Sequence, residues 1–463
     1  MKRIASVGLL SGLFALALAV PALAASGLTV LHTFQGWDGN YAYGRLVQGN
    51  DGAFYGTTLS GGPGTGTVYR VDVDGNFKLL HAFQGPDDGI SPNAGLVLMD
   101  DGNFYGTTSD WGPCQEPCAS GGTVFRMNPD GVLTTLHTFA SNTRPYSLAA
   151  GRDGLLYGVT GAGGSHGYGS IYSIATDGTY RLLVSFDRTA GIWSPQGRLV
   201  EGTDGNFYGT TINGGTYEAG TVFRMTPDGA ITLLHGINGT TDGDTPYAGL
   251  VQGDDGRFYG GTQRGGSGFG TLFAITADGD FTVLHAFNHG DGSGLKDALL
   301  QWSDGFLYGT SGGGGNQNAG TLFRLSPDGR LSTLHLFAPG DVAVPATAPV
   351  LGSDGRLYGT TAMSVYAFDL AAPRTPELHL AGLCTPPSIH NDCLGIRVGA
   401  DIQLEWASAN VAACRASGAW SGIRRRGGIQ TFQAAETGTF VYRIDCTGPN
   451  GHVSDQVVVK VGR

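Results

Sequence analysis

The chain has 463 residues, of which 80 are glycine and only 14% are charged, and its formal net charge at pH 7 is −11. An acidic surface repels phosphate backbones, so we expect no nucleic-acid partner. The abundance of glycine, with no sustained 3.6-residue apolar period, argues for an all-β chain rich in tight turns.

The opening residues have the layout of a secretory signal peptide, which we expect to span residues 1–24. A short basic start is followed by an apolar run over residues 4–20 and by the small-x-small cleavage site Ala22-Leu23-Ala24. No later stretch reaches the roughly 20 apolar residues that a membrane helix needs. We therefore expect an exported protein, periplasmic or extracellular, without a membrane span.

Residues 25–370 form a tandem repeat of about 50 residues. A Tyr-Gly pair recurs seven times at intervals of 49 to 52 residues. A fixed period of this length is typical of solenoids, propellers and arrays. The tyrosines of the seven pairs are Tyr55, Tyr105, Tyr157, Tyr208, Tyr259, Tyr308 and Tyr358.

One period, residues 248–287, contains four predicted strands. Asp-Gly turns at Asp255 and Asp278 divide it, and Asp-Gly between alternating apolar runs is the strongest short-range hairpin signal. The strands are expected at residues 248–252, 257–262, 270–275 and 281–287. Four antiparallel strands per period describe one blade of a β-propeller.

The number of turns predicts how the ring closes. Asp-Gly separates the first and second strands seven times but the third and fourth only six times, so the seventh unit lacks its last strand. Residues 28–34 match residues 331–337 and precede the first complete unit. We predict a seven-bladed β-propeller closed by this N-terminal strand, which removes both exposed sheet edges. A β-solenoid is the alternative, but it would have no use for the displaced strand.

The units resemble the GloVer tandem repeat of exported "choice-of-anchor" proteins. The resemblance rests on L-x-x-L-H-x-F at residues 331–337, D-G-x-x-Y-G-T-T at 204–211 and G-T-V-F at 220–223, and it covers residues 28–369. It implies a repeat domain on the cell exterior and brings no catalytic residues. Such proteins end in a sorting or anchoring tail, whereas residues 457–463 carry no hydrophobic span, so the resemblance does not extend to surface anchoring.

The period vanishes after a linker with two prolines at residues 371–376, and residues 377–463 form a second predicted domain. Trp406, Cys414 and Cys446 resemble the tryptophan and paired cysteines of bacterial immunoglobulin-like (Ig-like) sandwiches, although here the tryptophan precedes both cysteines. We therefore expect a small Ig-like β-sandwich at the C-terminal end.

Six cysteines in an exported protein favour disulfides. On the resemblance to Ig-like domains, Cys414 pairs with Cys446 and closes a loop worth about 3 to 4 kcal/mol. Cys384 with Cys393, and Cys114 with Cys118, would then be local links. Zinc is the alternative at Cys114 and Cys118, but no second pair of ligands lies at the spacing of zinc sites.

Residues that recur in every unit are interpreted as scaffold. The fourth strand carries a histidine in six of seven units, and the symmetry of a propeller places equivalent residues too far apart to share an ion. We expect no metal, cofactor or catalytic set. The Gly of Tyr-Gly is expected to allow close backbone approach between blades. The six histidines are His32, His81, His137, His235, His285 and His335.

Up-and-down strand connections place all the Asp-Gly turns on one face of the ring and the variable loops on the other. Aromatic rings beside acidic groups suit sugars, whose apolar faces stack while their hydroxyls find acceptors. Alternatively, these rings pack down and cover the ends of the blades. The predicted ligand-binding residues of the variable loops are Trp37, Tyr41, Trp111, Trp193, Tyr217, Tyr247 and Asp242.

These observations favour a monomeric binding protein whose partner is a polysaccharide or a cell-surface protein. One alternative is a propeller glycan hydrolase or lyase that uses loop carboxylates, for which Asp88, Asp242, Asp244 and Asp291 are candidates. Another is a structural envelope protein without a small ligand.

Overall fold

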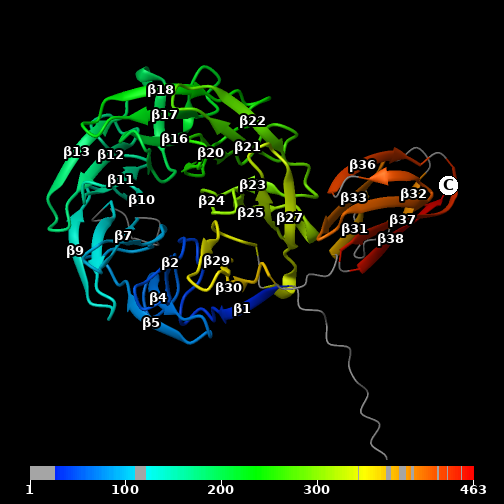
Figure 1. Ribbon diagram of the computed structural model, residues 1–463, viewed down its shortest axis with the longest axis horizontal. Helices are drawn as coiled ribbons and strands as arrows, with labels where there is room; N and C mark the ends of the chain where they lie inside the picture. Colours follow the sequence, from blue (N-terminus) through cyan, green and yellow to red (C-terminus); the bar gives the residue numbers. More distant parts are fainter. Residues whose placement is uncertain are drawn as a thin grey trace, which may run out of the picture.

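The computed structural model shows a ring of β-sheets with a smaller β-structure at its side (Figure 1). The predicted signal peptide, Trp111, Cys114 and Cys118 lie outside the described residues. The structure describes residues 27–109, 121–341, 344–371, 377–384, 393–397, 401–424, 427–434, 436–449 and 451–462. No helix in these ranges is long and apolar enough to cross a membrane.

The ring consists of antiparallel sheets of four or five strands, and each sheet is built almost entirely from one repeat. The first three sheets are β2 (Val47–Gln48), β3 (Phe54–Thr58), β4 (Thr67–Val71) and β5 (Phe77–Ala82); β6 (Val97–Leu98), β7 (Phe104–Thr108), β8 (Thr123–Met127) and β9 (Leu133–Thr138); and β10 (Pro145–Ala150), β11 (Leu156–Thr160), β12 (Ser170–Ile174) and β13 (Tyr180–Ser185).

The remaining sheets of the ring follow the same plan, and two of them gain an extra strand from a variable loop. They are β14 (Ile192–Pro195), β15 (Val200–Glu201), β16 (Phe207–Gly214), β17 (Thr221–Met225) and β18 (Ile231–Gly236); β19 (Val251–Gln252), β20 (Phe258–Gly261), β21 (Thr271–Ile275) and β22 (Phe281–Ala286); β23 (Ser293–Leu295), β24 (Leu300–Gln301), β25 (Leu307–Gly313), β26 (Thr321–Leu325) and β27 (Leu331–Leu336); and β28 (Val350–Leu351), β29 (Leu357–Thr360), β30 (Ser364–Phe368) and β1 (Leu28–Thr33).

Short 3₁₀ turns at η1 (Arg188–Ala190), η2 (Asn316–Asn318) and η3 (Pro339–Asp341) are the helical elements of the described chain. The four strands expected in residues 248–287 are confirmed as β19 to β22. The first strand is shorter than predicted because the residues before it come close to the backbone of the preceding repeat. A Cβ on Gly249 would lie 2.8 Å from the carbonyl oxygen of Arg198.

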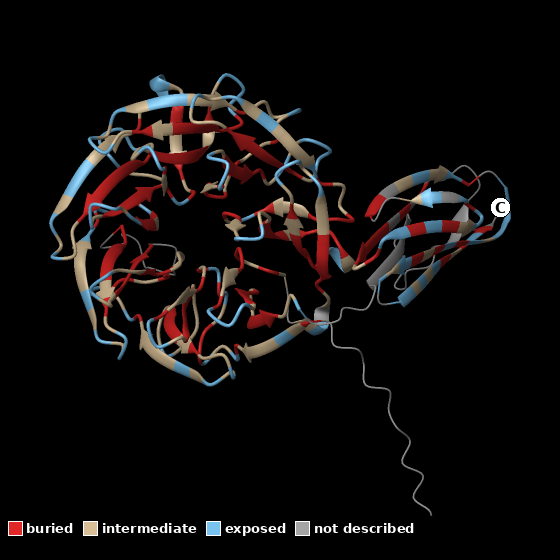
Figure 2. Ribbon diagram, viewed as in Figure 1, coloured by how far each residue is buried: buried red, intermediate tan, exposed pale blue. Residues whose placement is uncertain are grey.

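The middle strands are buried and the outermost strands are partly exposed (Figure 2). Each outermost strand carries a bulge just before its conserved histidine position, as between β17 and β18, and a bulge bends a strand and redirects its side chains. The residue at the bulge points its carbonyl at the next repeat. A Cβ on Gly229, in the turn between the third and fourth strands, would lie 2.8 Å from the oxygen of Leu183.

The tyrosine of each Tyr-Gly pair is tied to the aspartate of its own Asp-Gly turn. The Tyr208 hydroxyl donates to Asp204 at 2.8 Å, and the equivalent bond is present in all seven copies. Burial raises the pKa of Asp204, but the hydrogen bonds from Asn206 and Tyr208 outweigh it and lower the pKa overall. The repeated motif is therefore a bonded turn that joins the first two strands.

The expectation that the Gly of Tyr-Gly allows backbones of different blades to approach is wrong. A Cβ on Gly209 would lie 2.6 Å from the ring of Phe223, which belongs to the third strand of the same sheet. The glycine therefore leaves room for an aromatic ring within its own sheet. Close backbone approach between repeats falls instead on glycines such as Gly229 and Gly249.

The first and last repeats contact each other as consecutive repeats do. Tyr208 stacks on Phe258 of the next repeat at 3.8 Å, and Tyr358 of the last repeat stacks on Phe54 of the first at 3.9 Å. β1 pairs antiparallel with β30. Residues from the two ends of the repeat region thus lie side by side in the ring (Figure 1).

The C-terminal residues form two sheets around one core of apolar side chains. Trp406, Trp420 and Ile444 are buried in this core. One sheet contains β31 (Glu377–Cys384), β33 (Asp401–Ala409) and β36 (Gly427–Gln433), and the other contains β32 (Cys393–Arg397), β38 (Gly451–Gly462), β37 (Gly438–Gly448), β34 (Ala413–Gly418) and β35 (Gly422–Arg424).

The predicted disulfide between Cys414 and Cys446 is confirmed. The two cysteines lie opposite each other on β34 and β37, with their Cα atoms 4.1 Å apart, so the bond joins neighbouring strands of one sheet. The side chains of Cys384 and Cys393 lie outside what the structure describes.

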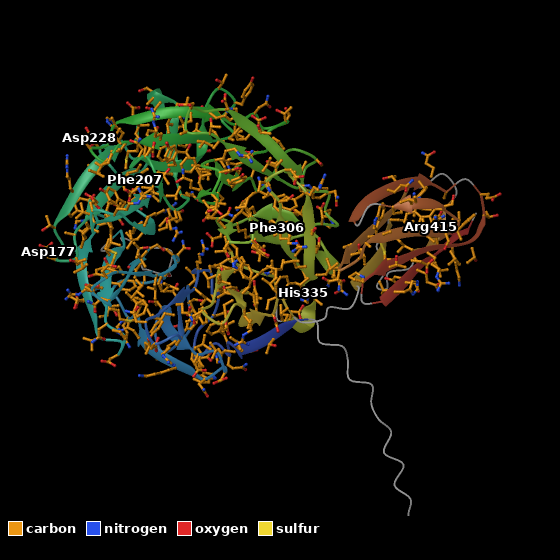
Figure 3. All side chains as sticks on the ribbon, viewed as in Figure 1. Asp177, Phe207, Asp228, Phe306, His335 and Arg415 are labelled. Carbon is orange, nitrogen blue, oxygen red and sulfur yellow. A yellow bond between two sulfur atoms is a disulfide. The ribbon has the colours of Figure 1, made fainter. Side chains whose placement is uncertain are left out.

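The C-terminal sheets rest against the sixth repeat. Leu336 of β27 packs with Ala407 and Ala409 of β33 in a small buried cluster. His335, on the same strand, lies between the ring and the C-terminal sheets (Figure 3) and is only 4% exposed. One outer strand of the ring is therefore covered, whereas its equivalents elsewhere face solvent.

Candidate functional site

A cavity of about 580 Å³ lies at the axis of the ring, and every repeat contributes to its wall. The lining residues come mainly from the segment between the variable loop and the first strand of each repeat. Because strands of a propeller converge on the axis, this segment brings side chains from distant parts of the sequence together. Its lining includes Tyr43, Arg45, Asn93, Tyr146, Ser147, Gln196, Arg198, Tyr247, Lys296 and Asp297.

The cavity wall differs from repeat to repeat, although the strands behind it do not. The residue before the one that pairs with the repeated tyrosine is a leucine in six repeats and Pro349 in the seventh, and the leucine packs into the core, as Leu199 does. One position earlier, the residue is small in five repeats and an arginine in two. These residues are Arg45, Gly95, Ser147, Arg198, Gly249, Ala298 and Ala348.

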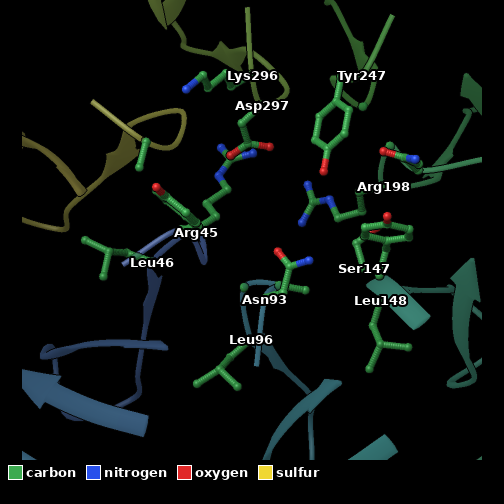
Figure 4. A pocket seen from close by; sticks show the side chains of 18 of the residues that line it. Arg45, Leu46, Asn93, Leu96, Ser147, Leu148, Arg198, Tyr247, Lys296 and Asp297 are labelled. Atoms are coloured by element: carbon green, nitrogen blue, oxygen red, sulfur yellow. The ribbon is translucent and has the colours of Figure 1, made fainter. Parts of the chain in front are cut away.

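The two arginines point toward the open centre of the ring, together with Tyr247 and Asn93 (Figure 4). The Arg198 side chain is exposed and lines the cavity. Desolvation by the surrounding wall, with repulsion from Arg45, lowers the pKa of Arg198 to about 10, against an opposing attraction from Asp297. The cavity thus holds an accessible guanidinium group whose charge the surrounding protein disfavours.

The single carboxylate in the cavity wall, Asp297, is bonded to the backbone. Its two oxygens accept hydrogen bonds from the amides of Ala298 at 2.7 Å and Ala348 at 3.0 Å. Arg45 donates to the carbonyl of Pro349 at 3.4 Å. No hydrogen bond or ion pair of Arg198 is found within the described chain, and Lys296, which also lines the cavity, is exposed.

Three of the four predicted loop carboxylates, Asp88, Asp242 and Asp291, are bound to the repeated histidines, whereas Asp244 accepts the hydroxyl of Thr245 at 2.9 Å. His235 Nε2 lies 2.9 Å from Asp242 Oδ2, and the same carboxylate accepts the amide of Asn238 at 3.1 Å. Burial raises the pKa of Asp242, but these bonds outweigh it and the pKa is lowered. The equivalent pairs are His32–Asp38, His81–Asp88, His285–Asp291 and His335–Asp341.

These five pairs fasten the start of the variable loop to the outermost strand in their repeats. The histidine rings also stack on the following repeat, as His235 does on Phe281 at 4.1 Å. In the described ranges no group of three or more His, Cys, Asp or Glu residues is placed to hold a metal ion. The structure therefore gives the histidines contacts that fasten loops and join repeats.

The predicted aromatic residues do not gather in one place. Tyr247 lines the cavity. Trp37 and Tyr217 are well exposed on different repeats, and Tyr41 lies beside the cavity residue Tyr43, with ring centroids 5.7 Å apart. Trp193 packs edge-on against Tyr168 and under Arg188, so it covers the end of its sheet.

Arg45 and Arg198 were not identified from the sequence as site residues. The signal that could have found them is a departure from the repeat, since both stand where the other units have a small residue. A repeat motif is defined by the residues that recur, so it does not mark positions at which single repeats differ.

Solved structures with a propeller-like fold are similar to the chain at low sequence identity. The streptogramin B lyase structure has a TM-score of 0.54 and 15% identity, and the match covers 73% of this chain and 96% of that protein. Catalytically inactive virginiamycin B lyase from Staphylococcus aureus with quinupristin has a TM-score of 0.53 and 17% identity, and the match covers 74% of this chain and 99% of that protein. The extracellular domain of a putative hybrid two-component system from B. thetaiotaomicron has a TM-score of 0.53 and 11% identity, and the match covers 93% of this chain and 57% of that protein.

At these identities the likenesses show the fold alone. No curated protein matches the chain in sequence. A model of the Gloeobacter/Verrucomicrobia repeat matches residues 18–193 and 144–368, two overlapping ranges that span most of the chain. The chain therefore belongs to the family of proteins built from the Gloeobacter/Verrucomicrobia repeat.

Proposed function

We propose that this protein is an exported binding protein that takes a saccharide at the axis of its ring, on the face that carries the variable loops. The observation that carries the proposal is the cavity, whose wall combines polar and apolar groups and varies between repeats. Its volume of about 580 Å³ falls within the usual range of small-ligand sites. A purely structural ring would have no need of this variety.

The proposed architecture is a seven-bladed propeller formed by residues 25–370. Its support is one sheet per repeat, the pairing of β1 with β30 and the stacking of Tyr358 on Phe54. Residues 371–376 would be the linker, and residues 377–463 an Ig-like sandwich. Two sheets around a shared core with buried tryptophans support the last assignment.

Export is supported by the layout of the first 24 residues and by the Cys414–Cys446 disulfide, because structural disulfides persist in oxidising compartments. We propose a periplasmic or extracellular location.

The saccharide is proposed because aromatic rings lie beside the polar cavity. Tyr43 and Tyr41 are both about two-fifths exposed, and Tyr43 belongs to the cavity wall. Exposed tyrosine faces stack on the apolar faces of sugars, and amide or hydroxyl groups such as those of Asn93 and Tyr247 bond sugar hydroxyls.

A hydrolase or lyase that uses loop carboxylates has less support. Asp88, Asp242 and Asp291 each bond to the histidine of their own repeat, and these carboxylates recur as part of the repeat. Release of new reducing or unsaturated sugar ends by the protein, abolished in Asp242→Asn, would favour this alternative over simple binding.

A glycan array with the purified full chain tests the proposal. We expect binding that weakens on changing Tyr41 and Tyr43 to Ala and that is unchanged in Leu233→Ala, an exposed apolar residue on the outermost strand β18. No binding to any saccharide, with the fold intact, would reject the proposal in favour of a protein partner or a structural role.

A further inference from the structure

The axis of the ring is cationic in a protein of net charge −11. The cavity wall contains Arg45, Arg198 and Lys296 but only one carboxylate, Asp297. The acidic residues that dominate the chain lie largely in its turns and loops. The excess positive charge at the axis is thus local to the cavity.

Arg198 is the group that the surrounding protein leaves uncompensated. Its side chain is exposed in the cavity, no hydrogen bond or ion pair of its guanidinium is found in the described chain, and both desolvation and repulsion from Arg45 disfavour its charge. Asp297 compensates only in part, because its one negative charge faces the three positive charges of Arg45, Arg198 and Lys296 in the cavity wall. A ligand that brings negative charge would remove this cost.

The repeat shows that folding does not need the arginines. The equivalent position is Gly95 in one repeat, Gly249 in another and Ala298 in a third, and the strands that follow are alike. The arginines also lie on non-adjacent repeats, the first and the fourth, so that their side chains reach the same space from different sides (Figure 4). They are best explained by what occupies that space.

We propose that the ligand is an acidic saccharide whose carboxylate is bound by Arg198 and Arg45. This inference rests on the proposed saccharide binding and adds the charge. Guanidinium groups match carboxylates with paired, charge-assisted hydrogen bonds. Tyr247, Asn93 and Gln196 line the same cavity and supply donors and acceptors for the hydroxyls of the sugar ring.

Calorimetric titration of the full chain with a short oligogalacturonate, and with its methyl ester as the uncharged form of the same sugar, tests the inference. We expect the acid to bind at least about tenfold more tightly than the ester, the value of a hydrogen bond to a charged group. Affinity should fall as salt rises from low ionic strength, because salt screens attraction between charges.

Single variants place the charge effect at the axis. Arg198→Gln and Arg45→Gln are each expected to weaken binding of the acid by about tenfold or more and to leave binding of the ester unchanged. Arg330→Gln is the matched control, since its side chain is 87% exposed at a turn between third and fourth strands. Melting temperatures of all variants show whether the fold is kept.

The outcomes separate the two proposals. Equal affinity for acid and ester, or no effect of either arginine substitution, overturns the inference and leaves saccharide binding in place. No binding of either form overturns both. Inorganic sulfate that competes at the same concentration as the oligosaccharide would also overturn the inference, because the site would then select a free anion and not a sugar.

Discussion

The outer and inner parts of the ring follow opposite rules. In the outer part, seven repeats use the same tyrosine, aspartate and glycine for the same contacts, as at Asp204, Tyr208 and Gly209. At the axis, equivalent positions carry arginine, glycine, serine or alanine. Shared residues identify what each sheet needs in order to fold, and unshared residues identify where the protein can be adapted to a ligand.

The largest effect on folding is expected from the aromatic core of a sheet. Phe223 is fully buried against Gly209 and Leu199, so Phe223→Ala should lower the free energy of unfolding by about 3 to 5 kcal/mol. Denaturant titration measures the loss. If Phe223→Ala cost no more than the exposed Leu233→Ala, the core would not be where the stability of the ring resides.

A smaller effect distinguishes two kinds of buried tyrosine. Tyr208→Phe removes the bond to Asp204 and should cost about 1 kcal/mol. Tyr172→Phe should be neutral or stabilising, because the Tyr172 hydroxyl is buried without a partner and other repeats have phenylalanine there. Equal losses in the two variants, measured by denaturant titration, would contradict the assignment of Tyr208 to the scaffold.

Acid should weaken the outer part of the ring through its aspartate turns. The folded-state pKa values of Asp51, Asp101, Asp204, Asp255 and Asp354 are lowered, because hydrogen bonds outweigh the effect of burial. Their contribution is therefore complete above the unfolded value of about 3.9 and is lost as pH falls through the lower folded values.

Melting temperature measured between pH 6 and pH 2.5 should fall mainly below about pH 4. Asp204→Asn should make that fall shallower, with a change at neutral pH of no more than about 1 kcal/mol. A melting temperature that is constant down to pH 2.5 would contradict the role given to these turns.

The smallest effect on folding is expected at the axis. Arg198→Gln should change the free energy of unfolding by less than about 0.5 kcal/mol, as substitutions outside packed or bonded regions do. Because the substitution removes the repulsion between Arg198 and Arg45, a slight increase in stability is favoured. A loss comparable to that of Phe223→Ala would show that the arginine supports the fold and would break the contrast between axis and periphery.

Much of the repeat could be read from the sequence, because turns and strands are local. The strands of residues 248–287 follow directly from Asp-Gly turns and alternating apolar residues. The family resemblance is confirmed as well. The bond between Tyr208 and Asp204 also joins residues four positions apart, but its geometry depends on the turn and was not inferred.

The histidines were correctly interpreted as structural, but their partners were missed. The aspartate follows its histidine by six or seven residues, across a loop of variable sequence, so no fixed motif records the pair. In the C-terminal sheets, Trp420 was missed although it is buried and its indole donates to the carbonyl of Arg443 at 2.8 Å. Its place depends on strand pairing that local patterns do not specify.

The candidate site could not be predicted because it forms only when the ring brings distant repeats together. Arg45 and Arg198 are far apart in sequence and neither belongs to a motif. Of the predicted aromatic residues that the structure describes, Trp193 lies in strand β14 and only Tyr247 lines the cavity. Sequence patterns located the loops, and three-dimensional closure determined which side chains meet.

Because β1 pairs with β30, the ring can close only after the last repeat has been synthesised. β1 is the first strand of the ring to leave the ribosome and its partner is the last. At roughly 10 residues per second, β1 waits about half a minute for its partner strand. An unpaired strand edge is a template for another chain, so two chains that finish together can exchange their first strands. High expression should therefore yield strand-swapped dimers alongside the monomer.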